Sequence, residues 1–229
     1  MDAASSIAAG WAPPSAVERA ALSSAGWLHL PGLLARPELE ALHQAWDRAA
    51  ETQERDPADG CWGPKALELE PGFQTCLSHP RVTGAVAALL DGDVTLRSLH
   101  GREPMAGHGR QGLHADWPTP PEPDRQLLAN AFWALDDMDD GNGATRLVPG
   151  SHRLHQTPRG AWAQPHGRHP DEVVLCVRAG DAIVFSGHLW HGGGLNRAGA
   201  RRRVIIAQFG RAALAAPFSR PPSLRPTAP

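Results

Sequence analysis

LLANAFWAL, the segment Leu127–Leu135, decides the fold, because its leucine, phenylalanine and tryptophan side chains predict a buried β-strand. Segments of the same apolar character, separated by glycine or proline turns, are Val94–His100, Thr145–Val148, Val173–Arg178, Ala182–Phe185 and Arg203–Phe209. Several strands of this kind after a helical start predict an antiparallel sandwich or barrel with helices packed on one face.

The chain before these strands is predicted to be mainly helical. Its expected elements are a helix over Ser15–Ala25, a strand over Trp27–Leu30, a helix from Pro37 to Ala50, a loop over Glu51–Gly63 and a helix from His79-Pro80 to Asp91-Gly92. Two long segments, Arg102–Arg125 and His152–Asp171, interrupt the later strands and are typical of functional lids.

Length and composition limit the class of protein. The 229 residues suit a single domain over residues 1–229, with its core in about residues 15–210 and a flexible tail at 212–229. A hydrophobic fraction of 41% permits a packed core, and a net charge of −2 argues against nucleic-acid binding. The sequence has no long apolar run, signal peptide or C-x-x-C pair, so we expect a cytoplasmic protein with no membrane or nucleic-acid partner.

A histidine and an acid lie close together in His114-Ala115-Asp116, and a third candidate, His191, follows much later. Alternation along an extended segment places His114 and Asp116 on the same side. Two imidazoles and one carboxylate leave positions open on a metal, as in the facial triad of non-haem Fe(II) oxygenases. The alternative is a chance tripeptide in a chain with 12 histidines. His188 is assigned no metal role.

Four motifs strengthen the metal interpretation. They are GWLHLPGLL at 26–34, NGATRLVPGSH at 142–152, AGDAIVF at 179–185 and LWHGGGLN at 189–196. In this order they resemble the phytanoyl-CoA dioxygenase-like family of Fe(II)/2-oxoglutarate-dependent oxygenases. The resemblance implies a mainly β protein with flanking helices around a double-stranded β-helix (jelly-roll, cupin-like) core. It also implies Fe(II), 2-oxoglutarate and O₂ as cofactor and cosubstrates.

The same resemblance assigns individual residues. His114, Asp116 and His191 fall on the metal-ligand positions, and no further catalytic residue is expected. Arg202 lies eleven residues after the second histidine, where the family has its basic residue for the distal carboxylate of 2-oxoglutarate. A guanidinium suits this task, since it can bind a carboxylate through two parallel hydrogen bonds. Periodicity alone does not choose between Arg202 and the arginines beside it.

Weaker assignments concern the rest of the pocket. Arg97 lies on the strand where relatives place a polar residue near the keto-acid end of the cosubstrate, and Trp117 and Phe132 are candidates for the substrate pocket. Many relatives carry a hydroxyl residue two positions after the second histidine, where this chain has Gly193. Either Thr145 substitutes for that hydroxyl, or Arg202 holds the carboxylate alone.

The expected activity is oxidation of an unactivated C–H bond, by hydroxylation or a related reaction, in a small metabolite or natural-product intermediate, with succinate and CO₂ as co-products. Related halogenases lack the ligand carboxylate, so Asp116 favours a hydroxylase over a halogenase. The alternatives are a non-enzymatic jelly-roll metal-binding or regulatory protein, and a cupin-like metalloenzyme independent of 2-oxoglutarate. The sequence indicates a small-molecule substrate, but neither its identity nor the oligomeric state.

Overall fold

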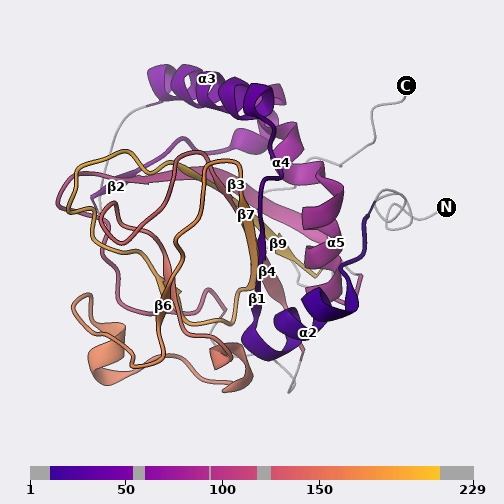
Figure 1. The fold of residues 1–229 in the computed structure, drawn as a ribbon, viewed down its shortest axis with the longest axis vertical. Coiled ribbons are helices and arrows are strands. Elements are labelled where there is room, and N and C mark those ends of the chain that lie inside the picture. Colours follow the sequence, from indigo (N-terminus) through magenta and orange to yellow (C-terminus); the bar gives the residue numbers. More distant parts are fainter. Residues whose placement is uncertain (1–10, 54–59, 93, 118–124, 212–229) are drawn as a thin grey trace.

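Two antiparallel sheets form the centre of the computed structural model, which describes residues 11–53, 60–92, 94–117 and 125–211 (Figure 1). The larger sheet has the strand order β1-β7-β4-β9-β3-β2 and the smaller one β6-β5-β8. The strands are β1 Trp27–Leu30, β2 Cys61–Trp62, β3 Thr95–Pro104, β4 Leu128–Ala134, β5 Arg146–Leu147, β6 Val173–Val174, β7 Ala182–Ser186, β8 His191–Gly192 and β9 Val204–Gly210. This architecture confirms the expected mainly β fold with a jelly-roll core.

Helices cover the outer face of the larger sheet (Figure 1). They are α2 Ala16–Ala25, α3 Arg36–Thr52, α4 Gln74–Ser78 and α5 Pro80–Leu89, with short 3₁₀ turns η2 Leu67–Leu69, η3 Pro71–Phe73, η4 Ser151–Arg153 and η5 Gly160–Ala163. Helix α2 begins at Ser15, which forms a capping box with Glu18, and ends at Gly26, whose φ of 82° provides the left-handed cap. These local signals explain why its boundaries agree with the sequence prediction.

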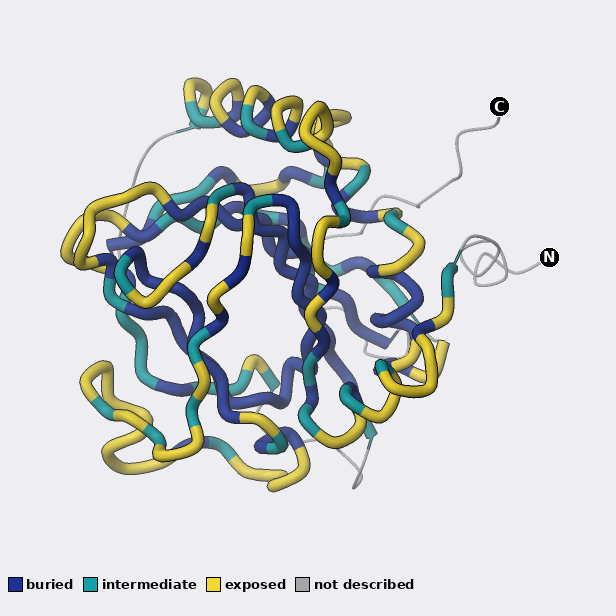
Figure 2. Tube along the Cα trace, in the orientation of Figure 1, coloured by how far each residue is buried: buried dark blue, intermediate teal, exposed yellow. Residues whose placement is uncertain are grey.

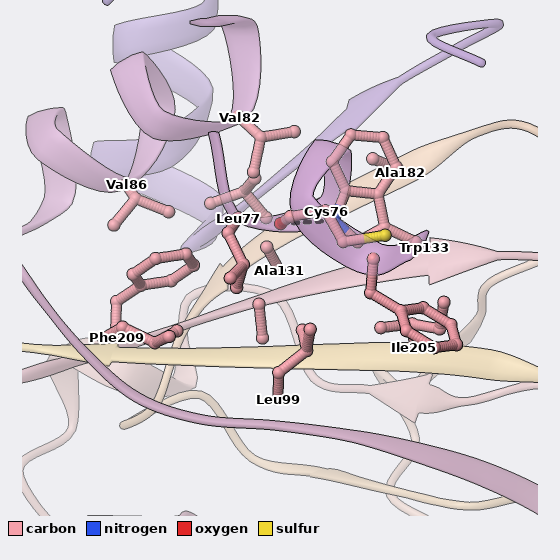
Figure 3. Packing of buried hydrophobic residues seen from close by; sticks show 14 of the residues in the cluster. Cys76, Leu77, Val82, Val86, Leu99, Ala131, Trp133, Ala182, Ile205 and Phe209 are labelled. Atoms are coloured by element: carbon pink, nitrogen blue, oxygen red, sulfur yellow. Dashed lines mark hydrogen bonds between the residues drawn. The ribbon is translucent and has the colours of Figure 1, made fainter. Parts of the chain in front are cut away.

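Alternation along β4 divides its side chains between the two faces of the sheet. Ala131 and Trp133 face the helices, where the Trp133 indole N–H donates a hydrogen bond to the Cys76 carbonyl at 3.1 Å (Figure 3). Asn130 and Phe132, which alternate with them, line a cavity on the opposite face. The apolar side of β4 therefore anchors the helices, while its other side is left for the site.

The central strands of the larger sheet are buried, and the helices that cover it are exposed on their outer side. Every residue of β4 and β7 is buried, whereas α3 carries exposed residues along its outer side (Figure 2). Within the described ranges, no helix combines the length and apolar character that a membrane span needs.

Two short strands correct the sequence prediction. The prediction of a loop over Glu51–Gly63 is wrong at β2, because these two residues form a strand that pairs with the end of β3. Strand β8 lies in a glycine-rich stretch for which the sequence predicts no strand. Both strands form by pairing with distant segments, and local composition carries little information about such pairing.

The two predicted lids also differ in extent from the structure. Strand β3 continues beyond His100 to Pro104, so the segment Arg102–Arg125 begins inside a strand, and residues 118–124 lie outside the described ranges. The second predicted lid contains η4 and η5. The predicted tail at 212–229 also lies outside the described residues, and the extent of the domain stays a prediction.

Asp181 fastens β1 and its following turn to the start of β7. Its carboxylate accepts hydrogen bonds from the backbone N–H of Gly32 at 2.8 Å and of Arg178 at 2.9 Å, and lies 2.8 Å from His29 Nε2. Burial raises the pKa of Asp181, but these hydrogen bonds outweigh it and hold the pKa below its usual value.

We expect Asp181→Ala to lower the free energy of unfolding by about 1–3 kcal/mol in urea titrations, because the backbone N–H groups of Gly32 and Arg178 lose their charged acceptor. The depressed pKa means that this stabilisation is complete above the ordinary aspartate pKa of about 3.9 and is lost as pH falls through the folded-state value. Asp171→Ala, at a side chain that is 78% exposed, is the control. An equal loss in both variants would contradict the assignment.

Candidate active site

His114, Asp116 and His191 lie together, with candidate ligand atoms all within 4.8 Å of one another. Asp116 Oδ1 is 3.8 Å from His114 Nε2 and 3.7 Å from His191 Nε2. The two histidines are held by reciprocal backbone hydrogen bonds of 2.8 and 2.9 Å, which join the H-x-D segment to β8. These separations are too long for hydrogen bonds but suit a divalent ion with bonds of about 2.0–2.2 Å.

Both imidazoles are oriented by their second nitrogen. His114 Nδ1 lies 3.1 Å from the Gly112 carbonyl oxygen, and His191 Nδ1 lies 2.9 Å from that of Leu189. Because a carbonyl oxygen only accepts, each Nδ1 carries the proton and donates it, which leaves the Nε2 lone pair for a ligand. Metal-binding histidines are commonly oriented in this way.

Asn130 fixes the carboxylate. Its amide donates a hydrogen bond of 2.7 Å to Asp116 Oδ2, so that Oδ1 is the oxygen facing the histidines. Asn130 is 1% exposed and is the one polar residue in the apolar stretch LLANAFWAL. That contrast was the available signal for this residue, which the sequence analysis missed.

Burial, and next the charge of His191, lower the pKa of His114, which favours the neutral ligand form.

A cavity of about 160 Å³ adjoins the three residues. Besides them, its polar lining within the described part of the chain comprises His100, Arg102, Gln111, Asn130, Thr145, Arg202 and Gln208. Phe132 and Ile206 are its larger apolar residues. The cavity therefore suits a small polar ligand that reaches from the metal-binding cluster to a cation.

Arg202 supplies that cation. Its side chain is 1% exposed, and among the described residues no carboxylate forms an ion pair with it and its Nε has no hydrogen-bond partner. Burial lowers the pKa of Arg202 to about 10, so the guanidinium stays charged at neutral pH. A buried charge without a counter-charge is costly, and a ligand carboxylate would relieve that cost.

The weaker sequence assignments separate into two groups. Thr145 and Phe132 line the cavity, as a pocket role requires. Arg97 and Trp117 are not among its lining residues. Arg97 lies at a register shift of β3, with its side chain against Gly210, so its cofactor role stays a prediction without support from its position.

His188 lies outside the metal-binding cluster, as expected. Its Nε2 accepts a hydrogen bond of 3.2 Å from the Leu127 backbone N–H. Burial lowers the pKa of His188 to about 4, so the ring is neutral at physiological pH. These contacts are those of a structural histidine.

Gln111 is a cavity residue that the sequence analysis did not identify. Its Oε1 accepts a hydrogen bond of 3.0 Å from the Gly193 backbone N–H, and its own carbonyl accepts one of 2.6 Å from Arg146. Arg146 also forms a buried ion pair of 2.7 Å with Glu172 and donates to the Gly167 carbonyl. The two predicted lid segments are therefore fastened to each other beside the cavity.

Comparisons with known proteins identify relatives of the chain. The model of the family described as "Phytanoyl-CoA dioxygenase (PhyH)" matches residues 22–204. The dioxygenase af480 of Aspergillus fumigatus is 28% identical over 217 residues, which cover 89% of this chain and 67% of af480. The dioxygenase olcK of Penicillium canescens is 35% identical over 56% of this chain and 44% of its own length. The matched part of the chain thus covers about two thirds of the length of af480 and less than half of the length of olcK.

Solved structures share the fold. HygX of Streptomyces hygroscopicus, crystallised with nickel and 2-oxoglutarate, has a TM-score of 0.75 at 17% identity, covering 88% of each chain. The epimerase SnoN, crystallised with Fe³⁺, α-ketoglutarate and nogalamycin RO, has a TM-score of 0.69 at 21% identity, covering 90% of this chain and 92% of SnoN. The family match over most of the sequence confirms the expected resemblance, and the chain belongs to the phytanoyl-CoA dioxygenase family.

Proposed function

We propose that the protein is an Fe(II)- and 2-oxoglutarate-dependent oxygenase that hydroxylates an unactivated C–H bond of a small metabolite or natural-product intermediate. Succinate and CO₂ are the co-products. The observation that carries the proposal is the buried Arg202, which has no ion pair among the described residues and lies in the same cavity as the three-residue metal cluster. A metal site alone does not need this cation, whereas a dicarboxylate cosubstrate does.

Each residue of the site has a distinct task in this proposal. His114, Asp116 and His191 bind Fe(II), and the guanidinium of Arg202 binds the distal carboxylate of 2-oxoglutarate. When bound, the metal and its cosubstrate supply the activation of O₂ and the oxidising power. Asn130 orients the ligand carboxylate through its 2.7 Å hydrogen bond. Thr145 and Gln111 offer further polar contacts in the cavity.

The ion pair between Arg146 and Glu172 positions the segments beside the cavity. The exposed fractions of these side chains are 1% and 6%. Arg146 also donates to the Gln111 carbonyl in one predicted lid and to the Gly167 carbonyl in the other. By joining the lids in this way, Arg146 limits the access of water to the proposed reaction centre, which is a general task of such segments.

Hydroxylation is preferred to halogenation because Asp116 retains the ligand carboxylate, which leaves one fewer position for a halide. The fold also supports other outcomes, since SnoN is an epimerase. A natural-product substrate is favoured by the relatives, among them HygX, crystallised with hygromycin B. A cytoplasmic location and the lack of a nucleic-acid partner stay predictions.

Two other candidates lead to different expectations. A vestigial metal-binding or regulatory protein would not consume 2-oxoglutarate, and a cupin-like metalloenzyme would not need Arg202. The buried cation that faces the cavity favours the oxygenase over both.

Replacing either His114 or His191 with alanine should abolish Fe(II) binding and the weak visible absorption expected when Fe(II) and 2-oxoglutarate are added without O₂. His188→Ala should retain both and lose only stability, because the Leu127 N–H loses its acceptor. Equilibrium dialysis and anaerobic absorption spectra provide the measurements. Normal iron binding in His191→Ala would remove the basis of the site.

Arg202→Ala should weaken 2-oxoglutarate binding by roughly 30-fold to several thousand-fold, since loss of one partner of a buried charge pair costs about 2–5 kcal/mol. Arg202→Lys should recover only part, because an ammonium lacks the planar fork. Calorimetric titration of the Fe(II) protein under argon measures the affinity. Arg178→Ala, at a side chain that is 83% exposed, is the matched control. Unchanged binding in Arg202→Ala would contradict the proposed cosubstrate.

Gly193→Ser tests whether the family's missing hydroxyl can be restored. A Cβ at this position would lie 2.4 Å from the Gly109 carbonyl oxygen and 3.3 Å from Gln111 Oε1. We therefore expect a loss of about 1–3 kcal/mol in unfolding free energy and weaker 2-oxoglutarate binding. Thermal unfolding and calorimetry measure the two effects. Tighter binding at unchanged stability would show that the hydroxyl does fit.

A further inference from the structure

Strands β4 and β9 each carry one amide side chain in an otherwise apolar sequence. Asn130 is the amide of β4, in LANAFWA, and Gln208 is the amide of β9, in VIIAQFG. The antiparallel register of the two strands places Asn130 directly opposite Gln208. Their neighbours Ala131 and Ala207 pack in the core on the helix side, whereas both amides line the cavity. The two amides therefore meet on the inner face of the sheet, beside the metal-binding cluster.

A chain of two hydrogen bonds leads from Gln208 to the ligand carboxylate. Gln208 Nε2 donates to Asn130 Oδ1 at 3.4 Å, and Asn130 Nδ2 donates to Asp116 Oδ2 at 2.7 Å. The second bond is short, as is usual for a carboxylate acceptor, while the first joins two neutral amides and is long. Both bonds run in the same direction, because each donor faces the group that lies nearer to the carboxylate.

The chemistry of the three groups fixes this direction. An ionised carboxylate only accepts hydrogen bonds, so the Asn130 side chain turns its NH₂ group toward Asp116. The amide oxygen of Asn130 then faces away from Asp116, and it needs a donor because the residue is 1% exposed. Gln208 supplies that donor from the neighbouring strand. With a hydrogen bond at each end, the Asn130 amide is held in a single orientation.

We propose that Gln208 is a positioning residue of the metal site and acts on Asp116 through the side-chain amide of Asn130. By fixing that amide, Gln208 keeps Oδ2 of Asp116 engaged. The other oxygen, Oδ1, is then the one that faces His114 and His191. The inference rests on the proposed role of the three-residue cluster in binding Fe(II).

The expected size of the effect follows from the position of each amide in the chain. Groups that orient a metal ligand directly contribute about 10–100-fold to metal affinity, and Asn130 is such a group. Gln208 is one hydrogen bond further from the metal, and that bond is long. Its loss should therefore cost about three- to tenfold in metal affinity, which is the usual net contribution of a single hydrogen bond.

A purely structural role for Gln208 makes a different prediction. If the two amides only satisfy each other inside the sheet, loss of Gln208 lowers stability, and any effect on metal affinity is the same with or without Asn130. If Gln208 acts through Asn130, its effect on metal affinity disappears once the Asn130 amide is removed. A double-mutant cycle therefore separates the two roles.

The experiment measures Fe(II) affinity by equilibrium dialysis under argon for Gln208→Met, Asn130→Ala and the double variant. We expect a loss of about three- to tenfold for Gln208→Met and about 10–100-fold for Asn130→Ala. The double variant should lie within about twofold of Asn130→Ala. Thermal unfolding of each variant checks that the protein is folded. The matched control is Gln74→Met, at an exposed glutamine whose amide donates to the Glu68 carbonyl at the same distance of 3.4 Å, and it should match the wild type.

Absorption spectra of the Co(II)-loaded protein add a readout of ligand geometry, because the visible bands of Co(II) depend on the number and arrangement of its ligands. We expect Gln208→Met and Asn130→Ala to shift these bands in the same direction, since both release the same carboxylate oxygen. Gln74→Met should leave the bands unchanged. Bands that shift in Asn130→Ala but not in Gln208→Met would contradict the inference.

Gln208→Ala repeats the comparison if Gln208→Met does not fold. Unchanged iron affinity in a folded Gln208 variant would overturn the inference, as would a loss of more than about twofold that persists in the Asn130→Ala background. His191→Ala separates this inference from the proposed function. If His191→Ala binds Fe(II) as the wild type does, the proposed function fails. If His191→Ala loses iron while the Gln208 variants keep the wild-type affinity, only the present inference fails.

Discussion

The backbone pairing of His114 with His191 is the constraint on which the site depends. Reciprocal hydrogen bonds of 2.8 and 2.9 Å fasten the H-x-D segment to β8, which pairs in turn with β5. The two imidazoles consequently lie with ring centroids 4.4 Å apart. Because β8 has only two residues, it takes its geometry from neighbours on both sides, and the metal-binding cluster exists only when the smaller sheet is assembled.

The larger sheet provides the other half of the site through its two faces. Trp133 and Ala131 of β4 pack against the helices, and this apolar contact permits a polar opposite face. Asn130 is tolerated there because Asp116 accepts its hydrogen bond. Arg202 is the exception, since the described residues give it no counter-charge. Burying the Arg202 guanidinium without a counter-charge lowers the stability of the fold, which is expected at a site where a ligand completes the charge pair.

The sequence predicted most of this arrangement where local signals are strong. LLANAFWAL became β4, and the capping signals at Ser15 and Gly26 located α2. The H-x-D tripeptide and the family motifs selected three residues that the structure brings together. The role of Arg97, which came from the family resemblance, stays a prediction, and this residue is not among those that line the cavity. A register shift between Leu96 and Ser98 alters the alternation along β3, and periodicity in the sequence cannot reveal it.

The close approach of residues 109–112 leaves no room for a side chain at Gly193, the position where the family resemblance implies a hydroxyl residue. The backbone of residues 109–112 approaches β8 and the following glycines so closely that a Cβ at Gly193 would overlap the Gly109 carbonyl. The same approach brings Gln111 to the cavity, where the Gly193 N–H holds its side-chain oxygen at 3.0 Å. The Gln111 amide nitrogen is then the group left for other contacts. The close approach of residues 109–112 thus both excludes a side chain at Gly193 and places the side chain of Gln111 at the cavity.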